Sequence, residues 1–207
     1  MPLFLLTSAR TAPAAEAFAY ALQSAKRATV VGEASMGAAN PGGEVDAGQG
    51  FSVFVSFATP INPITKSNWE GRGVTPDIEV KHEVALVTAR RLALEALVAK
   101  GQPPELATDT RWALDALRAE AGASSPAPAA DYAGAYGMMA VATAQGSLVL
   151  QQGRRPERTL LPLGNDRFAV LENPSQRAVF QRNAKGVVEA LEVRQSYGDV
   201  QRHRRSE

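Results

Sequence analysis

A low-complexity segment divides this chain and limits each side to a hydrophobic core of its own. Residues 122–131 read Gly-Ala-Ser-Ser-Pro-Ala-Pro-Ala-Ala-Asp. Small residues and prolines bury too little apolar surface to build a core. Strand and helix patterns alternate before this segment, and only strand patterns follow it. We therefore predict a first domain at residues 1–121, a linker at 122–131 and a second domain at 132–207.

The first region has the pattern of an α/β fold with a strand–turn–helix opening and a mixed sheet. Apolar and small polar residues alternate over residues 51–57, which predicts a half-buried strand. Two packing helices close the region, and Asp109 is a good N-cap for the second. The other expected elements are a strand at 3–6, a helix at 13–25, a strand at 28–31, a Gly-rich loop at 32–43 and an ordered loop at 60–77.

The second region is predicted to be a small all-β domain. Short apolar runs are separated by regularly spaced turn residues, such as Gln145-Gly146, Asn165-Asp166 and Gly198-Asp199. This spacing is typical of an antiparallel meander of about six or seven strands, closed or nearly closed into a barrel. The basic run at residues 202–205 is expected to be a solvated end.

Composition narrows the classes of function. The chain has 207 residues and a formal net charge of +1, which gives no indication of nucleic-acid binding. It contains no cysteine, and this excludes disulfides, thiolate catalysis and cysteine metal sites. We expect no cofactor and no bound metal. No apolar stretch is long enough to span a membrane. The apolar run at the amino terminus is too short for a signal peptide, so the cellular location stays open.

The opening segment carries the strongest chemical signal. Residues 3–6 form an apolar strand that passes through a short polar turn into an Ala-rich helix, the geometry in which many hydrolases present a nucleophile. This segment resembles the nucleophile motif of the tail-specific (C-terminal processing) serine proteases, in the tricorn-core and interphotoreceptor-retinoid-binding-protein-like branch. That family has a serine immediately before Ala-Ala-Glu. In this chain the residue is Pro13.

Two further segments support the same resemblance, in the same order along the chain. They are Arg27 to Glu33 with the following Gly-rich stretch 37–43, and the Trp69-Glu70-Gly71 region within residues 61–78. The second region is similar to a small β domain appended to several bacterial serine hydrolases, through residues 132–137, 146–151 and 161–168. The resemblance implies the carboxy-terminal part of a protease catalytic domain followed by an appended β domain. Relatives of this kind are often secreted or held in the bacterial envelope.

The resemblance assigns roles to three positions. Pro13 occupies the nucleophile position but has no hydroxyl, whereas it is well suited to start a helix. The backbone N–H of Ala14 matches the oxyanion donor. Glu70 matches an acidic residue that helps to orient the catalytic groups, and the alternative is a solvated loop carboxylate. Ser8 lies in the same turn, where it is expected to bond the backbone instead of replacing the nucleophile.

The base expected from the resemblance is also missing. One branch uses a lysine in the Gly-rich loop, and residues 32–43 contain none. The other branch uses a histidine upstream of the nucleophile motif. His82 and His203 match neither position and are expected to be surface residues.

The resemblance therefore implies a serine-type peptidase acting through an acyl-enzyme, and the residues predict a chain that is inactive alone. The expected partner is an unstructured peptide or protein segment, together with a missing amino-terminal half. Two alternatives stay open: a non-catalytic binding module that holds an extended peptide, and the product of a truncated gene.

Overall fold

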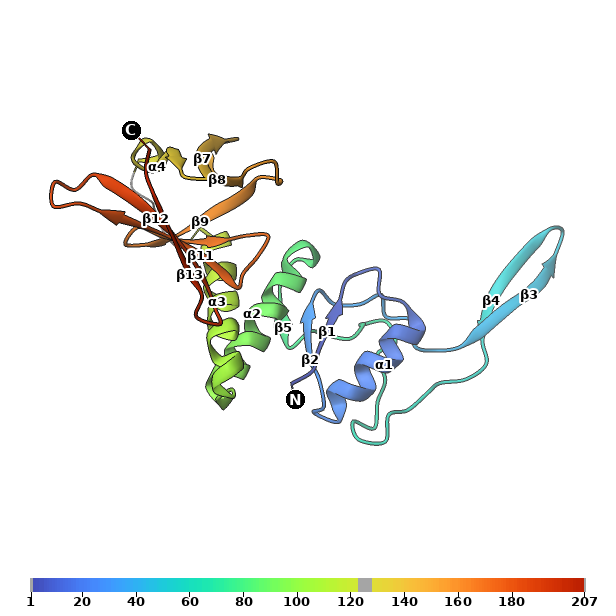
Figure 1. Ribbon diagram of the computed structural model, residues 1–207. Coiled ribbons are helices and arrows are strands. Elements are labelled where there is room, and N and C mark those ends of the chain that lie inside the picture. The colour runs from blue at the N-terminus through green and yellow to red at the C-terminus, as the bar shows by residue number, and fades with distance from the viewer. Residues whose placement is uncertain (1, 123–127, 207) are drawn as a thin grey trace. The chain divides into compact units, whose positions relative to one another are not determined.

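The computed structural model describes residues 2–122 and 128–206, which form two compact units, 1–93 and 94–207 (Figure 1). The first unit opens with β1 (Phe4–Thr7), α1 (Pro13–Ser24) and β2 (Thr29–Gly32). It continues with β3 (Gly42–Gly48), β4 (Phe51–Ser56) and β5 (Ile78–Glu79). Helix α2 (His82–Lys100) begins in this unit, and its last residues belong to the second. The strands and helix expected at 3–6, 13–25 and 28–31 are therefore confirmed within a residue or two.

The core of the first unit is a three-stranded parallel sheet in the order β1-β2-β5. Adjacent residues of β2 point to opposite faces, as strand geometry requires. Val30 packs with Ala19 of α1 on one face, and Val31 packs with Ala85 and Ala89 of α2 on the other. The sheet is thus covered on both faces by helices, the usual arrangement for parallel strands.

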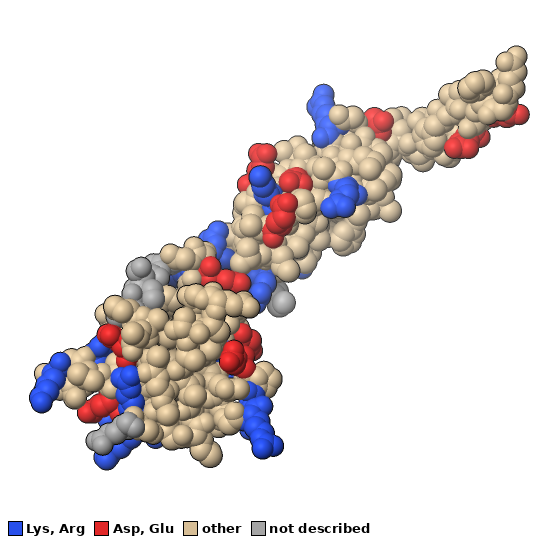
Figure 2. All heavy atoms as spheres, turned by 90° about the horizontal axis from the view of Figure 1, so that it is seen from above, with Lys and Arg blue, Asp and Glu red and all other residues tan. Residues whose placement is uncertain are grey.

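Strands β3 and β4 form a separate two-stranded antiparallel hairpin, and it corrects the prediction of a half-buried strand at 51–57. Every residue of β4 is exposed. The alternation holds except at Phe54, because Val45, Phe51, Val53 and Val55 share one face by their register, while Phe54 lies on the other face with the acidic residues. Neither strand pairs with a third in the described chain. Figure 2 shows acidic and uncharged side chains over this hairpin at the upper right, and none that is basic.

The second unit combines α3 (Pro104–Glu120) and α4 (Ala129–Tyr132) with eight strands. The strands are β6 (Gly134–Tyr136), β7 (Met139–Ala144), β8 (Ser147–Gln152), β9 (Arg158–Gly164), β10 (Arg167–Val170), β11 (Gln176–Arg182), β12 (Val188–Gln195) and β13 (Val200–Arg204). Each pairs antiparallel with its sequence neighbour, so the meander is confirmed with one or two more strands than predicted. The predicted turns at Gln145-Gly146, Asn165-Asp166 and Gly198-Asp199 each join two of these strands.

The sheet of the second unit curls until its two ends meet. Tyr136 of β6 forms an antiparallel bridge with Arg205, and the Ser206 N–H donates to the Ala135 carbonyl at 2.8 Å. The inward side chains make one apolar core that includes Tyr132, Phe168 and Phe180. The Tyr132 ring lies 5.0 Å from the Phe168 ring and 4.8 Å from the Phe180 ring, centroid to centroid. The fold is therefore a nearly closed barrel, as the turn spacing predicted.

Three local expectations are corrected. The second packing helix starts at Pro104 and not at Asp109, because proline at the first helical position followed by Glu105 is itself a start signal. The basic tail has regular backbone structure, since residues 200–204 form β13 and pair with β12, while the side chains of Arg202 and Arg204 are exposed as expected. Residues 123–127 of the predicted linker lie outside the described residues, whereas 129–132 form α4, in which Tyr132 is buried.

Helix α3 packs on β9 and β10. The predicted domain boundaries place this helix before the linker, while the compact second unit already includes it. Among the described residues, no helix is both long and apolar enough to cross a membrane.

Candidate functional site

The turn between β1 and α1 is held by its own hydroxyl groups. The Ser8 N–H donates to Thr11 Oγ1 at 3.0 Å, and the Thr11 N–H donates to the Ser8 carbonyl at 2.8 Å. Ser8 Oγ accepts a hydrogen bond from the Arg10 N–H at 3.3 Å. The expectation that Ser8 bonds the turn is therefore confirmed, and its hydroxyl is directed to its own backbone.

Helix α1 begins at Pro13, after Ala12 in an extended conformation. No side-chain hydrogen bond caps this helix start in the described chain. Ala14 follows Pro13, so its N–H is among the first four of the helix, which have no acceptor within it. Pro13 and Ala14 are both exposed. The position beside Pro13 therefore offers a free backbone donor and no side-chain nucleophile.

Glu16 is the most unusual group in the first unit, because its carboxylate is fully buried. One oxygen accepts hydrogen bonds from Ser35 Oγ at 2.5 Å and from the Gly37 N–H at 2.6 Å. The other accepts from the Ala38 N–H at 3.1 Å and from the Trp69 indole Nε1 at 3.2 Å. Four donors thus satisfy a charge that could not otherwise be buried.

These donors decide the protonation state of Glu16. Burial alone raises the pKa of a carboxyl group. The hydrogen bonds from Ser35, Gly37, Ala38 and Trp69 outweigh that effect and hold the pKa of Glu16 below its ordinary value of 4.5. The group is therefore a carboxylate at neutral pH, with its lone pairs occupied. It is placed to fix the backbone around it, and no lone pair remains to take a proton from a substrate.

The Gly-rich loop and the segment around Trp69 bind each other directly. The Val74 N–H donates to Ser35 Oγ at 2.6 Å, and the Gly71 N–H donates to the Gly37 carbonyl at 2.8 Å. Gly73 has a φ of +75°, and a Cβ there would lie 2.2 Å from the Ser35 carbonyl oxygen. The backbones approach too closely for any other residue at this position.

Glu70 also binds the Gly-rich loop, a few residues after Gly37. Its Oε2 accepts hydrogen bonds from the Ala39 N–H at 2.7 Å and from the Asn40 N–H at 2.8 Å. Although the side chain is exposed, it is more than a solvated carboxylate, because both bonds tie residue 70 to the Gly-rich loop. Its carboxylate oxygen is engaged by the loop and not by the Pro13 turn.

The three segments that carry the family resemblance therefore meet at one place. Glu16 comes from the Pro13 helix, Ser35 and Gly37 from the Gly-rich loop, and Trp69 from the third segment. The Met36 N–H also donates to the Thr11 carbonyl at 3.1 Å, which joins the loop to the Pro13 turn. Sequence reasoning missed Glu16 and Trp69 as the centre of this arrangement. The sequence feature that could have indicated a buried carboxylate is Glu16 itself, a lone acidic residue in an Ala-rich apolar helix.

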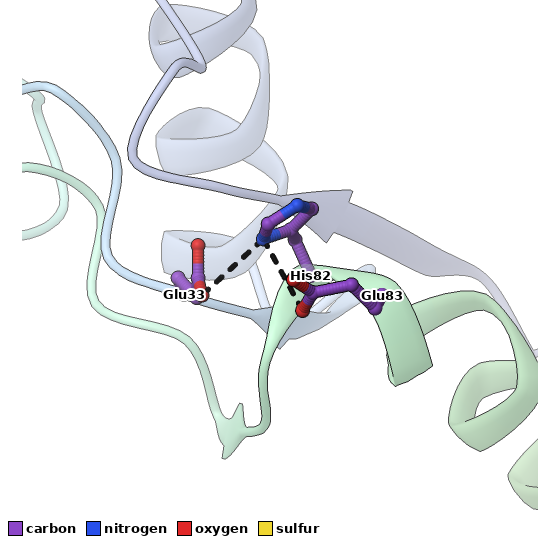
Figure 3. Close-up of side chains that lie close together, drawn as sticks. All are labelled: Glu33, His82 and Glu83. Carbon is purple, nitrogen blue, oxygen red and sulfur yellow. Dashed lines mark hydrogen bonds and ion pairs between the residues drawn. The ribbon is translucent and has the colours of Figure 1, made fainter.

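Neither histidine lies in this hydrogen-bonded site. His203 is in β13 of the second unit. His82 begins α2, and its Nδ1 lies 3.5 Å from Glu33 Oε1 and 3.5 Å from Glu83 Oε2 (Figure 3). Burial raises the pKa of Glu33, but hydrogen bonds from His82 and from the Ala9 backbone, with the charge of His82, hold it below its ordinary value. These three residues are the group in the described chain that could hold a metal ion.

Comparison with known proteins finds similarity in the first part of the chain. Residues 1–80 match the model of peptidase family S41. A similar solved structure is titled photosystem II D1 C-terminal processing protease; it is 33% identical over 41% of this chain, with a TM-score of 0.35. The match covers 22% of that protein's own length. The match to peptidase family S41 ends at residue 80, before α2 begins.

Proposed function

We propose that residues 1–80, which match the S41 serine peptidases, form a peptidase scaffold that is catalytically inactive in this chain alone. The observation that carries the proposal is Pro13 at the first position of α1, where the family resemblance places the nucleophilic serine. Serine attack needs a hydroxyl, a base and oxyanion donors. Of these three requirements, the described site supplies only an oxyanion donor, the Ala14 N–H; it supplies neither the hydroxyl nor the base.

The rest of the scaffold supports this proposal, because it is built without strain around the substituted position. Proline lacks the N–H that a helix start leaves unpaired, and its fixed φ suits the first helical turn. The buried Glu16 carboxylate has all of its donors, and Glu70 holds the Gly-rich loop in place. In this proposal Glu70 keeps the positioning role of its family counterpart, acting through the loop.

The test is hydrolysis of an unstructured protein such as casein by the purified 207-residue chain. We expect no turnover by the wild type or by Pro13→Ala, a matched control that removes the ring without adding a hydroxyl. Pro13→Ser restores the hydroxyl but not the base, so it is expected to remain at background. Turnover by the wild type that persists in Ser8→Ala and Thr11→Val variants would show that the nucleophile lies elsewhere.

A binding function is the second candidate, and the β3–β4 hairpin favours it. Its apolar face is exposed, and both of its outer edges are free in the described chain. Such an edge can accept an extended polypeptide as a further strand, with side-chain pockets supplying selectivity. We propose an unstructured peptide segment as the partner, and a separate amino-terminal half of the catalytic domain would use the same kind of contact.

The binding proposal is tested with the same substrate. Fluorescently labelled, unfolded casein is titrated with the full chain, and its anisotropy is measured. We expect binding without cleavage, and weaker binding by a Val53→Thr/Val55→Thr variant. The matched control is Ser52→Thr/Ser56→Thr, which changes the opposite face of β4. Equal binding by all three proteins would reject the hairpin as the docking site.

A further inference from the structure

Glu33, His82 and Glu83 bring three potential metal ligands to one side of the first unit (Figure 3). Glu33 follows directly after β2, while His82 and Glu83 are the first two residues of α2. One ligand atom from each residue lies within 4.8 Å of the other two. Because Glu33 and His82 are 49 positions apart, only the fold brings these ligands together.

The distances between the three side chains also suit a shared cation. His82 Nδ1 is 3.5 Å from an oxygen of each carboxylate, which is longer than the normal range for an N–H···O bond. Two ligands that each bind Zn²⁺ at about 2.1 Å with a tetrahedral angle lie roughly 3.4 Å apart. The imidazole nitrogen therefore has the spacing to both carboxylates that a zinc ion between them would require.

We propose that Glu33, His82 and Glu83 form a binding site for a single divalent cation of the zinc type, with water completing its coordination. One nitrogen and two carboxylate oxygens are a ligand set that Zn²⁺ accepts. All three side chains are partly or fully exposed, so the ion can enter from solvent and retain water ligands.

The local charges favour a cation. The start of a helix carries a partial positive charge, and this opposes binding at the first turn of α2. Two carboxylates supply a larger negative charge at the same place. The His82 ring contacts Glu33 only at a long distance, and Glu33 also accepts hydrogen bonds from the backbones of His82 and Ala9. A carboxylate has about four lone-pair sites, so Glu33 can keep these backbone bonds and still bind an ion.

The ligands are held by rigid parts of the fold, as a preformed metal site requires. The Glu33 N–H donates to the Thr7 carbonyl at 3.0 Å, and its own carbonyl accepts from Thr7 Oγ1 at 2.8 Å. The Val80 N–H donates to the Gly32 carbonyl at 2.9 Å, which fixes the chain just before α2. A bound ion would therefore join the end of β2 to the start of α2.

The experiment is a calorimetric titration of the metal-free full chain with Zn²⁺. The sequence makes the result easy to interpret, because it contains no cysteine and only two histidines. We expect one Zn²⁺ per chain, together with a rise in melting temperature that grows with the zinc concentration. The imidazole NMR signals of His82 should shift on titration, and those of His203 should not.

The variants His82→Gln and Glu33→Gln should each weaken binding about tenfold or more. Glu44→Gln, an exposed carboxylate on the hairpin, is the matched control and should bind as the wild type does. Unchanged affinity in His82→Gln, a shift at His203 only, or no saturable binding by the wild type would each overturn the site. If a variant does not fold, the wild-type NMR titration still decides the question. Because this site does not use Pro13 or the hairpin, its failure leaves the proposed function untouched.

Discussion

The indole Nε1 of Trp69 donates a hydrogen bond of 3.2 Å to the carboxylate of Glu16, 53 positions earlier in the sequence. Trp69 is itself buried, and its ring lies 5.2 Å from that of Tyr20, centroid to centroid. The contact joins α1 to the loop that precedes β5. Because the same carboxylate also binds Ser35, Gly37 and Ala38, it determines the shape of the first unit around the Pro13 turn.

Replacing Glu16 with glutamine should therefore destabilise the first unit. The amide group would turn two N–H hydrogens toward backbone or indole donors and lose the charge that strengthens the remaining bonds. We expect a loss of about 3 kcal/mol in the free energy of unfolding. The measurement is urea unfolding followed by tryptophan fluorescence in a Trp112→Phe background, in which Trp69 reports on the first unit alone. An unchanged midpoint would contradict the importance of this carboxylate.

Glu16 should also make the first unit sensitive to acid. Its folded-state pKa is lower than the ordinary value of 4.5, so the unfolded chain binds its proton more readily. The stabilisation is fully present above that ordinary value and is lost as the pH falls through the folded pKa. Unfolding measured from pH 6 downward, in the same Trp112→Phe background, should show a steeper loss of stability below about pH 4.5 than Glu16→Gln shows. Parallel curves would assign the acid sensitivity to other groups, such as Glu33.

Local signals in the sequence predicted the elements of this fold well. Pro13 marks the start of α1, and turn residues such as Gly146 and Asn165 separate the strands of the barrel. These signals act within a few residues, so they are visible without the fold. The convergence of Glu16, Ser35 and Trp69 depends on long-range packing, and no local pattern encodes it.

The hairpin shows a different reason why prediction failed. Alternation along residues 51–57 indicates that one face is apolar, but it does not say what covers that face. In the described chain the face of Val45 and Val53 has no covering element, and both residues are 53% exposed. A half-buried strand and an unpartnered amphipathic hairpin have the same sequence pattern.

Gly73→Ala should be far more harmful than Gly71→Ala, although both glycines have positive φ. A Cβ at Gly73 would lie 2.2 Å from the Ser35 carbonyl oxygen, whereas one at Gly71 would meet nothing within 4 Å. Gly71→Ala should therefore cost about 1–2 kcal/mol of backbone strain. Gly73→Ala must also displace the loop that binds Glu16, and we expect loss of cooperative unfolding of the first unit. Similar midpoints for the two variants would show that the backbones are not in close contact.

Arg177 is expected to hold α3 against the barrel of the second unit. Its side chain is 6% exposed; it donates to the Trp112 carbonyl of α3 at 2.6 Å and lies 4.7 Å from the centre of the Trp112 ring. Burial lowers the pKa of Arg177 to about 10, with Asp115 opposing the shift.

Lysine cannot reproduce these planar contacts, so Arg177→Lys should cost about 2 kcal/mol and speed hydrogen exchange in α3. Arg194→Lys is the control, because Arg194 is exposed and a lysine there can still pair with the half-buried Glu192; it should change stability by less than about 0.5 kcal/mol. Equal exchange rates in both variants would mean that α3 is held by its apolar side chains alone.

The exposed hairpin should govern self-association of the chain and contribute little to its stability. Val53 and Val55 lie on the apolar face of β4, and threonine keeps their β-branched shape while replacing one methyl group with a hydroxyl. Because both side chains are already exposed, Val53→Thr/Val55→Thr should change the free energy of unfolding by no more than about 0.5 kcal/mol. The same change should reduce concentration-dependent association in sedimentation velocity, since an unpaired apolar strand edge is a template for pairing with another chain. Ser52→Thr/Ser56→Thr, on the opposite face, should sediment as the wild type does. A large loss of stability in the valine variant would mean that the apolar face is packed in solution, and unchanged association would place the contact between chains on another surface.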